Sequence, residues 1–323
     1  MKRSCPFYIS TMLLFAIVFS SCSSANRVST ATSTPNQSTV RHIALVMKTL
    51  TNPFFVEMEK GARRAEKEFG IQLIVKTAAQ ETSIEQQIEI VNQLTRDKVD
   101  AIVIAPGDSR ELIPVLKKAQ DAGIIIINVD NQLDPDVSKT QGLKPVPFIG
   151  VDNKQGGYLS AKFVSDKVTT STQALILEGI TTAQNAQDRK TGAVKAFGEN
   201  QNITVVASQT ADWKIDEAYD VTKTLFSKYP DVKVIFAAND MMALGAIQYI
   251  QETKKTDVMV AGYDALDDAK KAIKDGSLRS TIDQQAAEQG YRGVKSAVQS
   301  LNGQTVPLTT IVDVFLVTAD TLK

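Results

Sequence analysis

Short apolar runs alternate with longer segments of mixed polarity from residue 41 to the end of the chain. Nine runs of four to six residues are rich in Val, Ile and other β-formers, and we expect them to be strands. They span residues 43–47, 72–76, 101–104, 124–129, 148–151, 174–178, 205–208, 234–237 and 258–263. Because nearly every position in them is apolar, they are typical of parallel sheets that helices cover on both faces. The number of βα units is larger than one compact sheet can hold. The pattern therefore predicts an α/β protein with two doubly wound parallel-sheet domains.

Capping residues mark the ends of the expected helices. Asn52-Pro53 places a capping side chain before a proline that suits the first helical position, and Gly70 follows the end of that segment. Ser83 and Gln86 have the spacing of a capping box, which predicts a second helix start.

The first 40 residues have a different composition from the rest. Lys2 and Arg3 precede the apolar run 12–19 and then Ser20-Ser21-Cys22, an arrangement that predicts a secretory signal at 1–21. The apolar run is shorter than the roughly 20 residues that span a bilayer. Cys22 after small residues resembles a bacterial lipobox, so we expect it to be acylated; cleavage nearby with a free cysteine is the alternative. Residues 22–40, rich in Ser, Thr and Ala, read as a flexible tether.

Composition excludes several classes of function. Lys plus Arg and Asp plus Glu are both 36, and no basic stripe predicts a nucleic-acid partner. The chain has one histidine, no cluster with metal-ligand spacing and no glycine-rich phosphate loop after a strand. We therefore expect no enzyme, no cofactor and no metal.

Polar and aromatic residues follow several of the expected strands. Ligands of doubly wound sheets bind beyond the carboxyl ends of the strands. The residues at such ends are Asn52, Phe54 and Phe55, then Asp130 and Asn131, then Asn239 and Asp240, and finally Asp264 after Tyr263. Carboxylates and amides pair with sugar hydroxyls, and aromatic faces pack on the C–H faces of a sugar ring. Taken singly, Asn52 and Asp240 could be helix caps, Phe54 and Phe55 core residues, and Trp213 a surface residue.

From about residue 41 the chain resembles the periplasmic ribose- and allose-binding proteins, which are type I sugar-binding components of ABC importers. The matching segments are Lys48 to Phe55 (KTLTNPFF), Val129-Asp130, Asp188-Arg189, Ala207 to Trp213 (ASQTADW), Phe236 to Gly245 (FAANDMMALG), Gly262-Tyr263-Asp264 and Thr281 to Gln284 (TIDQ).

The resemblance implies the roles of the site residues. Hydrogen bonds to the sugar would come from Asn52, Asp130, Arg189, Asn239, Asp264 and Gln284. Phe54 or Phe55 would sandwich the ring with Trp213, and Tyr263 would lie beside it. Arg189 near Asp130 or Asp264 would keep those carboxylates ionised. The implied lobes are 41–150 plus 285–310 and 151–284 plus 311–323, joined by a hinge that the chain crosses three times.

Two positions depart from the ribose-binding pattern. Lys48 stands where ribose binders have a serine, and Asn131 where they have an arginine. Both would line the pocket around a different sugar, so we expect a hexose, with allose or fructose as candidates, to bind more tightly than ribose. The alternative for Lys48 is a solvated position on the cleft rim.

The expected cycle is closure of the hinge over the sugar, followed by docking of the closed form on a membrane permease. We expect a monomer in the periplasm or on the outer face of the cell membrane, lipid-anchored through Cys22. Three alternatives stay open: an enzyme such as a glycosidase, the sensor core of a lactose-repressor-type regulator, and a binding or chemosensory protein for a nucleoside or a signalling furanone.

Overall fold

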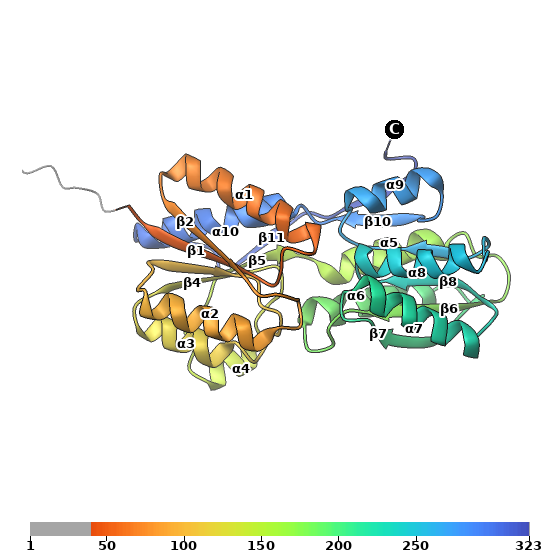
Figure 1. Cartoon of the computed structure of the whole chain (residues 1–323), viewed down its shortest axis with the longest axis horizontal. Helices are drawn as coiled ribbons and strands as arrows, with labels where there is room; N and C mark the ends of the chain where they lie inside the picture. The colour runs from red at the N-terminus through yellow and green to blue at the C-terminus, as the bar shows by residue number, and fades with distance from the viewer. Residues whose placement is uncertain (1–39, 323) are drawn as a thin grey trace, which may run out of the picture. The chain divides into compact units, whose positions relative to one another are not determined.

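The computed structural model describes residues 40–322 and contains two six-stranded sheets (Figure 1). The predicted signal, Cys22 and all but the last residue of the predicted tether lie outside the described residues. The first sheet has the order β11 (Thr309–Val312), β5 (Phe148–Val151), β4 (Ile125–Val129), β3 (Ala101–Ile104), β1 (His42–Met47) and β2 (Gln72–Thr77). All its neighbouring strands are parallel.

The second sheet repeats this winding. Its order is β12 (Phe315–Thr318), β10 (Ser280–Asp283), β9 (Met259–Ala261), β8 (Val232–Ala237), β6 (Thr172–Glu178) and β7 (Ile203–Thr210). Its strands are parallel except that β12 runs antiparallel to β10. Without the last strand, each sheet has the order 2-1-3-4-5 of a doubly wound fold, so the predicted fold class is confirmed.

Ten helices cover the sheets in the described part of the chain. They are α1 (Pro53–Phe69), α2 (Ile84–Arg96), α3 (Ile113–Asp121), α4 (Pro135–Thr140), α5 (Asn153–Ser165), α6 (Gln184–Gly198), α7 (Ile215–Lys228), α8 (Asp240–Glu252), α9 (Asp267–Asp275) and α10 (Ala286–Leu301). In the first lobe α1 and α10 lie on one face of the sheet, and α2 and α3 on the other (Figure 1). Alternate residues of β1 enter the two cores, Leu45 on the α1 side and Val46 on the α2 side. Burial on both faces explains why the strands are almost wholly apolar.

The predicted capping contact is present at one helix start and absent at another. Asn52 caps α1 by accepting a hydrogen bond from the Phe54 amide at 3.1 Å, and Gly70 ends the helix at φ 62°, as predicted. The second helix start is also confirmed, since Ser83 is the N-cap residue of α2, but the capping box is wrong, because the Ser83 side chain makes no capping bond. Gln86 instead accepts from the Ala79 amide at 2.8 Å and so holds the loop before α2.

The chain passes between the two sheets three times, after β5, after β10 and after β11. β5 ends at Val151 and β11 at Val312, both in the first sheet. Residues 151, 311 and 312, which the sequence analysis assigned to the second lobe, therefore belong to the first. The other lobe bounds stay a prediction.

Helices α1 and α10 approach each other so closely that only glycine fits at their contact. A Cβ on Gly61 would lie 1.7 Å from the Ala287 carbonyl oxygen, and one on Gly290 would lie 2.1 Å from that of Met58. Both obstacles are backbone atoms, which cannot turn aside. Helix α10 follows the second crossing, and its close contact with α1 depends on these two glycines.

We expect Gly290→Ala to lower the free energy of unfolding by about 2–3 kcal/mol, because the added methyl group forces the two helices apart. Urea denaturation measures the change. Gly198→Ala is the matched control, since a Cβ at the end of α6 meets nothing within 4 Å; it should leave stability unchanged or slightly raised. Equal stability of the two variants would contradict the close-packing argument.

Candidate functional site

Loops from the carboxyl ends of both sheets meet around a small cavity of about 20 Å³, enough for roughly one water. Nine of the twelve predicted site residues line it: Lys48, Asn52, Phe55, Asp130, Arg189, Trp213, Asn239, Asp264 and Gln284. Glu81 and Asn185 also line it and were not predicted. Phe54, Asn131 and Tyr263 do not line it. The strand-end rule therefore picked out most of the residues that line this cavity, while neighbouring positions in the loops were harder to separate.

Lys48, directly after β1, is buried rather than solvated, so the rim position is wrong. Its side chain is 2% exposed. The Nζ atom lies 3.0 Å from Asp130 Oδ2 and 3.9 Å from Glu81 Oε2. It also lies 5.6 Å from the centre of the Phe55 ring and 5.9 Å from that of Trp213. The ammonium group of Lys48 is therefore paired with two carboxylates and lies close to two aromatic faces.

Glu81 is the main residue that the sequence reasoning missed. Its Oε1 accepts a hydrogen bond from Asn52 Nδ2 at 2.9 Å. Burial raises the pKa of Glu81, and Lys48 and Asn52 only partly oppose this. Glu81 follows the carboxyl end of β2 by four residues, so the strand-end rule, applied to β2 as well, could have found it.

Arg189 on α6 is held in place by several partners. Its Nε donates to Asn153 Oδ1 at 2.8 Å and its Nη1 to the Ala238 carbonyl at 3.0 Å. The guanidinium lies 3.7 Å from the centre of the Tyr263 ring. Tyr263 is thus a support beneath Arg189, with its hydroxyl 3.4 Å from Asn153 Oδ1, and does not face the cavity. Because the guanidinium is fixed, its remaining donors point in defined directions.

Asp264 lies in an unusual backbone conformation, φ 119°, at the end of β9. Its Oδ1 accepts from Gln284 Nε2 at 2.6 Å and lies 3.6 Å from Arg189 Nη1. Arg189 lowers the pKa of Asp264, as expected, but does not offset the effect of burial. Burial raises the pKa of Asp264 well above its usual range, and the buried Asp240 carboxylate adds to the shift, despite Arg189. The other carboxylate named with it, Asp130, is paired with Lys48 instead.

The aromatic walls of the cavity are Phe55 and Trp213. Trp213 has a left-handed φ of 69°, and its ring lies on Gly179, where a Cβ would come within 2.0 Å of Cζ2. Phe54 stands edge-on to Phe55, with 5.0 Å between ring centres. It lines a separate groove of about 830 Å³ that also reaches α8 and α9. Of the two phenylalanines, only Phe55 lines the cavity.

Two cavity-lining amides also cap helices. Asn52 caps α1, and Asn239 caps α8 by accepting from the Met242 amide at 2.9 Å. The side-chain Nδ2 of Asn239 donates to the Trp213 carbonyl at 3.3 Å. These residues therefore cap a helix and also line the cavity. Asp240, by contrast, is buried behind the site and accepts from Thr281 Oγ1 and the Leu266 amide.

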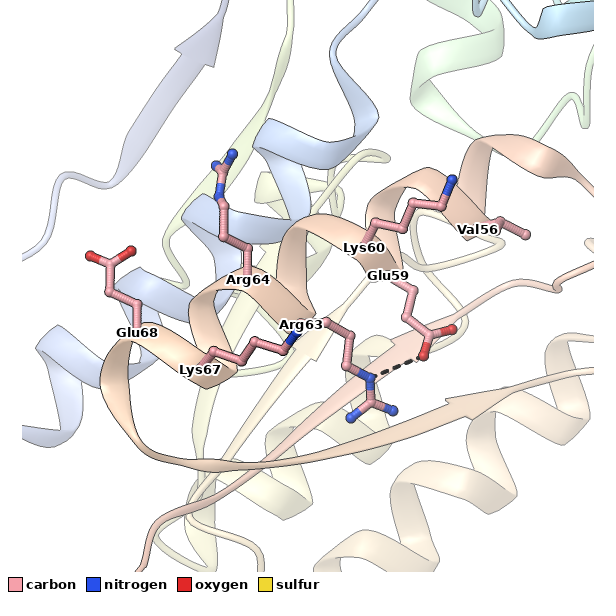
Figure 2. Close-up of a pocket in the computed structure, with 7 residues that line it drawn as sticks. All are labelled: Val56, Glu59, Lys60, Arg63, Arg64, Lys67 and Glu68. Carbon is pink, nitrogen blue, oxygen red and sulfur yellow. Dashed lines mark hydrogen bonds and ion pairs between the residues drawn. The ribbon is translucent and has the colours of Figure 1, made fainter.

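A larger hollow, of about 680 Å³, lies over the outer face of α1 (Figure 2). Its long charged side chains come from one helix and are paired with neighbours, as Arg63 is with Glu59 at 3.2 Å and with Glu66 at 2.9 Å. This is a solvated helix face with none of the predicted site residues. Within residues 40–322 no helix has the length and apolarity to cross a membrane, and no group of three or more acidic, His or Cys side chains could hold a metal ion.

The buried carboxyl of Asp240 makes stability depend on pH. Burial raises its pKa from 3.8 to about 7. Between these values the folded protein binds a proton that the unfolded chain releases, so the free energy of unfolding falls as pH rises. One proton accounts for at most about 1.4 kcal/mol per pH unit. In urea titrations at pH 5 and pH 7.5, Asp240→Asn should therefore reduce the loss of stability. The exposed Asp231→Asn should behave as wild type; equal losses in both variants would contradict this origin.

Comparison with known proteins places the chain in a family. A model of the periplasmic binding protein domain matches residues 43–305. A D-ribose/D-allose-binding protein of Pseudomonas aeruginosa is 38% identical over 300 residues, 92% of each chain. A ribose import binding protein of Escherichia coli is 33% identical over 305 residues, covering 94% of this chain and 96% of its own.

A solved structure has the same fold. The periplasmic solute-binding protein of an ABC transporter from Actinobacillus succinogenes, with bound D-allose, has a TM-score of 0.83 and 39% identity. The match covers 87% of this chain and 99% of that one. These relatives are binding proteins rather than enzymes, as predicted for this chain. The chain belongs to the periplasmic binding protein family, with the type I fold of its sugar-binding members.

Proposed function

We propose that the protein is the extracytoplasmic sugar-binding component of an ABC importer. The observation that supports this most strongly is the composition of one small cavity, where two aromatic walls, Phe55 and Trp213, combine with seven charged side chains and amides of the predicted set. Carboxylates accept and amides and guanidinium donate, so adjacent hydroxyls of a sugar find partners of both kinds. The apolar faces of the ring pack against the aromatic walls.

The favoured ligand is a hexose, with D-allose first and fructose next. The buried ammonium of Lys48 and the carboxylate of Glu81 add two charged partners on the side where ribose binders have a serine. A relative and a solved neighbour that both bind D-allose support the same choice. When the sugar binds, Lys48 exchanges some of its contacts with Glu81 and Asp130 for contacts with the sugar.

Ligand entry requires the two lobes to separate. The cavity walls come from both lobes, with Lys48 and Asp130 on one and Arg189 and Asp264 on the other. A space for roughly one water does not admit a monosaccharide while these side chains touch. The sugar binds one lobe and the other closes over it, and the closed form docks on a permease. The roles given to the site residues are part of this proposal, whereas the family membership does not depend on it.

The protein acts at the membrane as a monomer tethered through an acylated Cys22. Its family is periplasmic, and the small residues before Cys22 resemble a lipobox. An anchor keeps the binding protein close to its permease, which raises the local concentration of loaded protein.

Competition binding with ribose, allose, fructose, glucose, galactose and xylose tests the ligand. We expect a hexose to bind at least tenfold more tightly than ribose, about 1.4 kcal/mol. Lys48→Ala should change the ranking of the sugars, because it removes a charged partner from one side of the ring. If ribose ranks first by tenfold or more, the hexose proposal is wrong although sugar transport stands.

A control separates sugar binding from other ligands. Arg189→Ala should weaken binding of the preferred sugar at least thirtyfold, since losing one member of a buried charged pair costs about 2–5 kcal/mol. Arg63→Ala, on the outer face of α1, should leave binding unchanged. Binding of a nucleoside or a furanone, with no response to any of the six sugars, would contradict the proposed function.

Anchoring is tested by fractionating cells that express the full chain. Wild type should sediment with membranes and Cys22→Ser should not, because several acyl chains anchor a protein stably whereas none gives no affinity. Mass spectrometry of the mature N-terminus is the direct readout. A soluble wild-type protein that begins at another residue would refute acylation.

A further inference from the structure

Helix α6 begins without a cap of its own. The residue at its N-cap position is Ala183, whose extended backbone (φ −92°, ψ 127°) suits a cap but whose side chain offers no acceptor. The first amide groups of a helix have no partner within it, and a side chain such as Ser, Thr, Asp or Asn usually accepts from them. The first two amides of α6 belong to Gln184 and Asn185.

The opposite lobe supplies the missing acceptors. Ser109 Oγ, in the loop after β3, accepts from the Gln184 amide at 3.0 Å. Asn131 Oδ1, in the loop after β4, accepts from the Asn185 amide at 3.2 Å. The Ser109 amide also donates to the Thr182 carbonyl at 3.3 Å. The start of α6 is therefore capped from across the cleft, by residues of the first lobe.

The acceptors are held in place by their own lobe. Asn131 Nδ2 donates to the Pro106 carbonyl at 3.1 Å, which orients the amide so that Oδ1 faces α6. Ser109 Oγ lies 3.4 Å from the same Oδ1, and both side chains are buried. Neither residue lines the cavity. The predicted sugar contact of Asn131 is thus replaced by a contact between the lobes.

We propose that Ser109 and Asn131 form a latch that positions α6 only when the lobes are closed. When the cleft opens, the two amides of α6 exchange these acceptors for water, so the contact favours the closed form. The latch acts on the sugar through α6, which carries Asn185 and Arg189 of the site. This inference rests on the proposed hinge closure, and it makes Ser109 and Asn131 positioning residues that need no contact with the ligand.

The test compares association and dissociation rates of D-allose, followed by the fluorescence of Trp213, the one tryptophan of the chain. Ser109→Ala and Asn131→Ala should each raise the dissociation rate about fivefold, the size of one lost cap, and the double variant about twentyfold. The association rate should stay within twofold of wild type, because the latch forms after encounter. Unchanged dissociation, or an equal fall in the association rate, would overturn the proposal.

Ala183→Ser distinguishes a latch from a merely structural contact. A serine here caps α6 in both the open and the closed form, so closure no longer provides the only cap. The thermal midpoint of the sugar-free protein should rise or stay constant, while allose dissociates several times faster. A structural role predicts instead that a better cap slows dissociation or leaves it unchanged, and either result would contradict the latch.

A distance measurement without sugar keeps this test separate from the proposed function. Spin labels on Glu85→Cys in α2 and Thr224→Cys in α7, both exposed, report the separation of the lobes. Both Cys5 and Cys22 are replaced by serine. The Ser109→Ala, Asn131→Ala double variant should populate the open separation more than its parent. Identical distributions overturn the latch, whereas failure of allose to bind the parent counts against the proposed ligand alone.

Discussion

The cleft depends on two buried cations. Lys48 and Arg189 lie among four buried carboxylates, those of Glu81, Asp130, Asp240 and Asp264. Charges removed from water are costly unless paired, and here each cation faces a carboxylate on one side and an aromatic face on another. Burial raises the pKa of Glu81, Asp240 and Asp264, and the two cations oppose this only in part. The site is thus a network in which no member can be changed without affecting the others.

Much of the fold could be predicted from the sequence because burial on both faces leaves a strong signal. Strands such as β3 and β4 are continuous apolar runs, and all nine expected strands are present. Three strands were not expected, β10, β11 and β12. Each is four residues long; β10 (STID) is buried but has one apolar residue, and β11 and β12 lie at sheet edges and are half exposed. A strand of this kind has no run of buried apolar residues to reveal it.

The site was predictable to the level of its loops but less so to the level of its side chains. Asp130 and Asn131 are adjacent, yet Asp130 has a left-handed φ of 64° and the two side chains serve different ends. Sequence neighbours at such a turn point in different directions, which no pattern of residue types records. Asn185 was missed for a related reason, because it belongs to a helix start rather than to the turn directly after a strand.

The repeated crossing between the sheets has a consequence for the order of folding. The first sheet receives β11, and its face receives α10, only after every strand of the second sheet except β12 has been made. During synthesis the first 150 residues therefore lack a covering helix and an edge strand, and Gly61 has no partner helix. The first lobe to emerge can therefore be completed only near the end of synthesis, shortly before β12 completes the second. Its native contacts join residues more than 200 positions apart, which makes its folding slow and postpones compaction until nearly the entire chain is available.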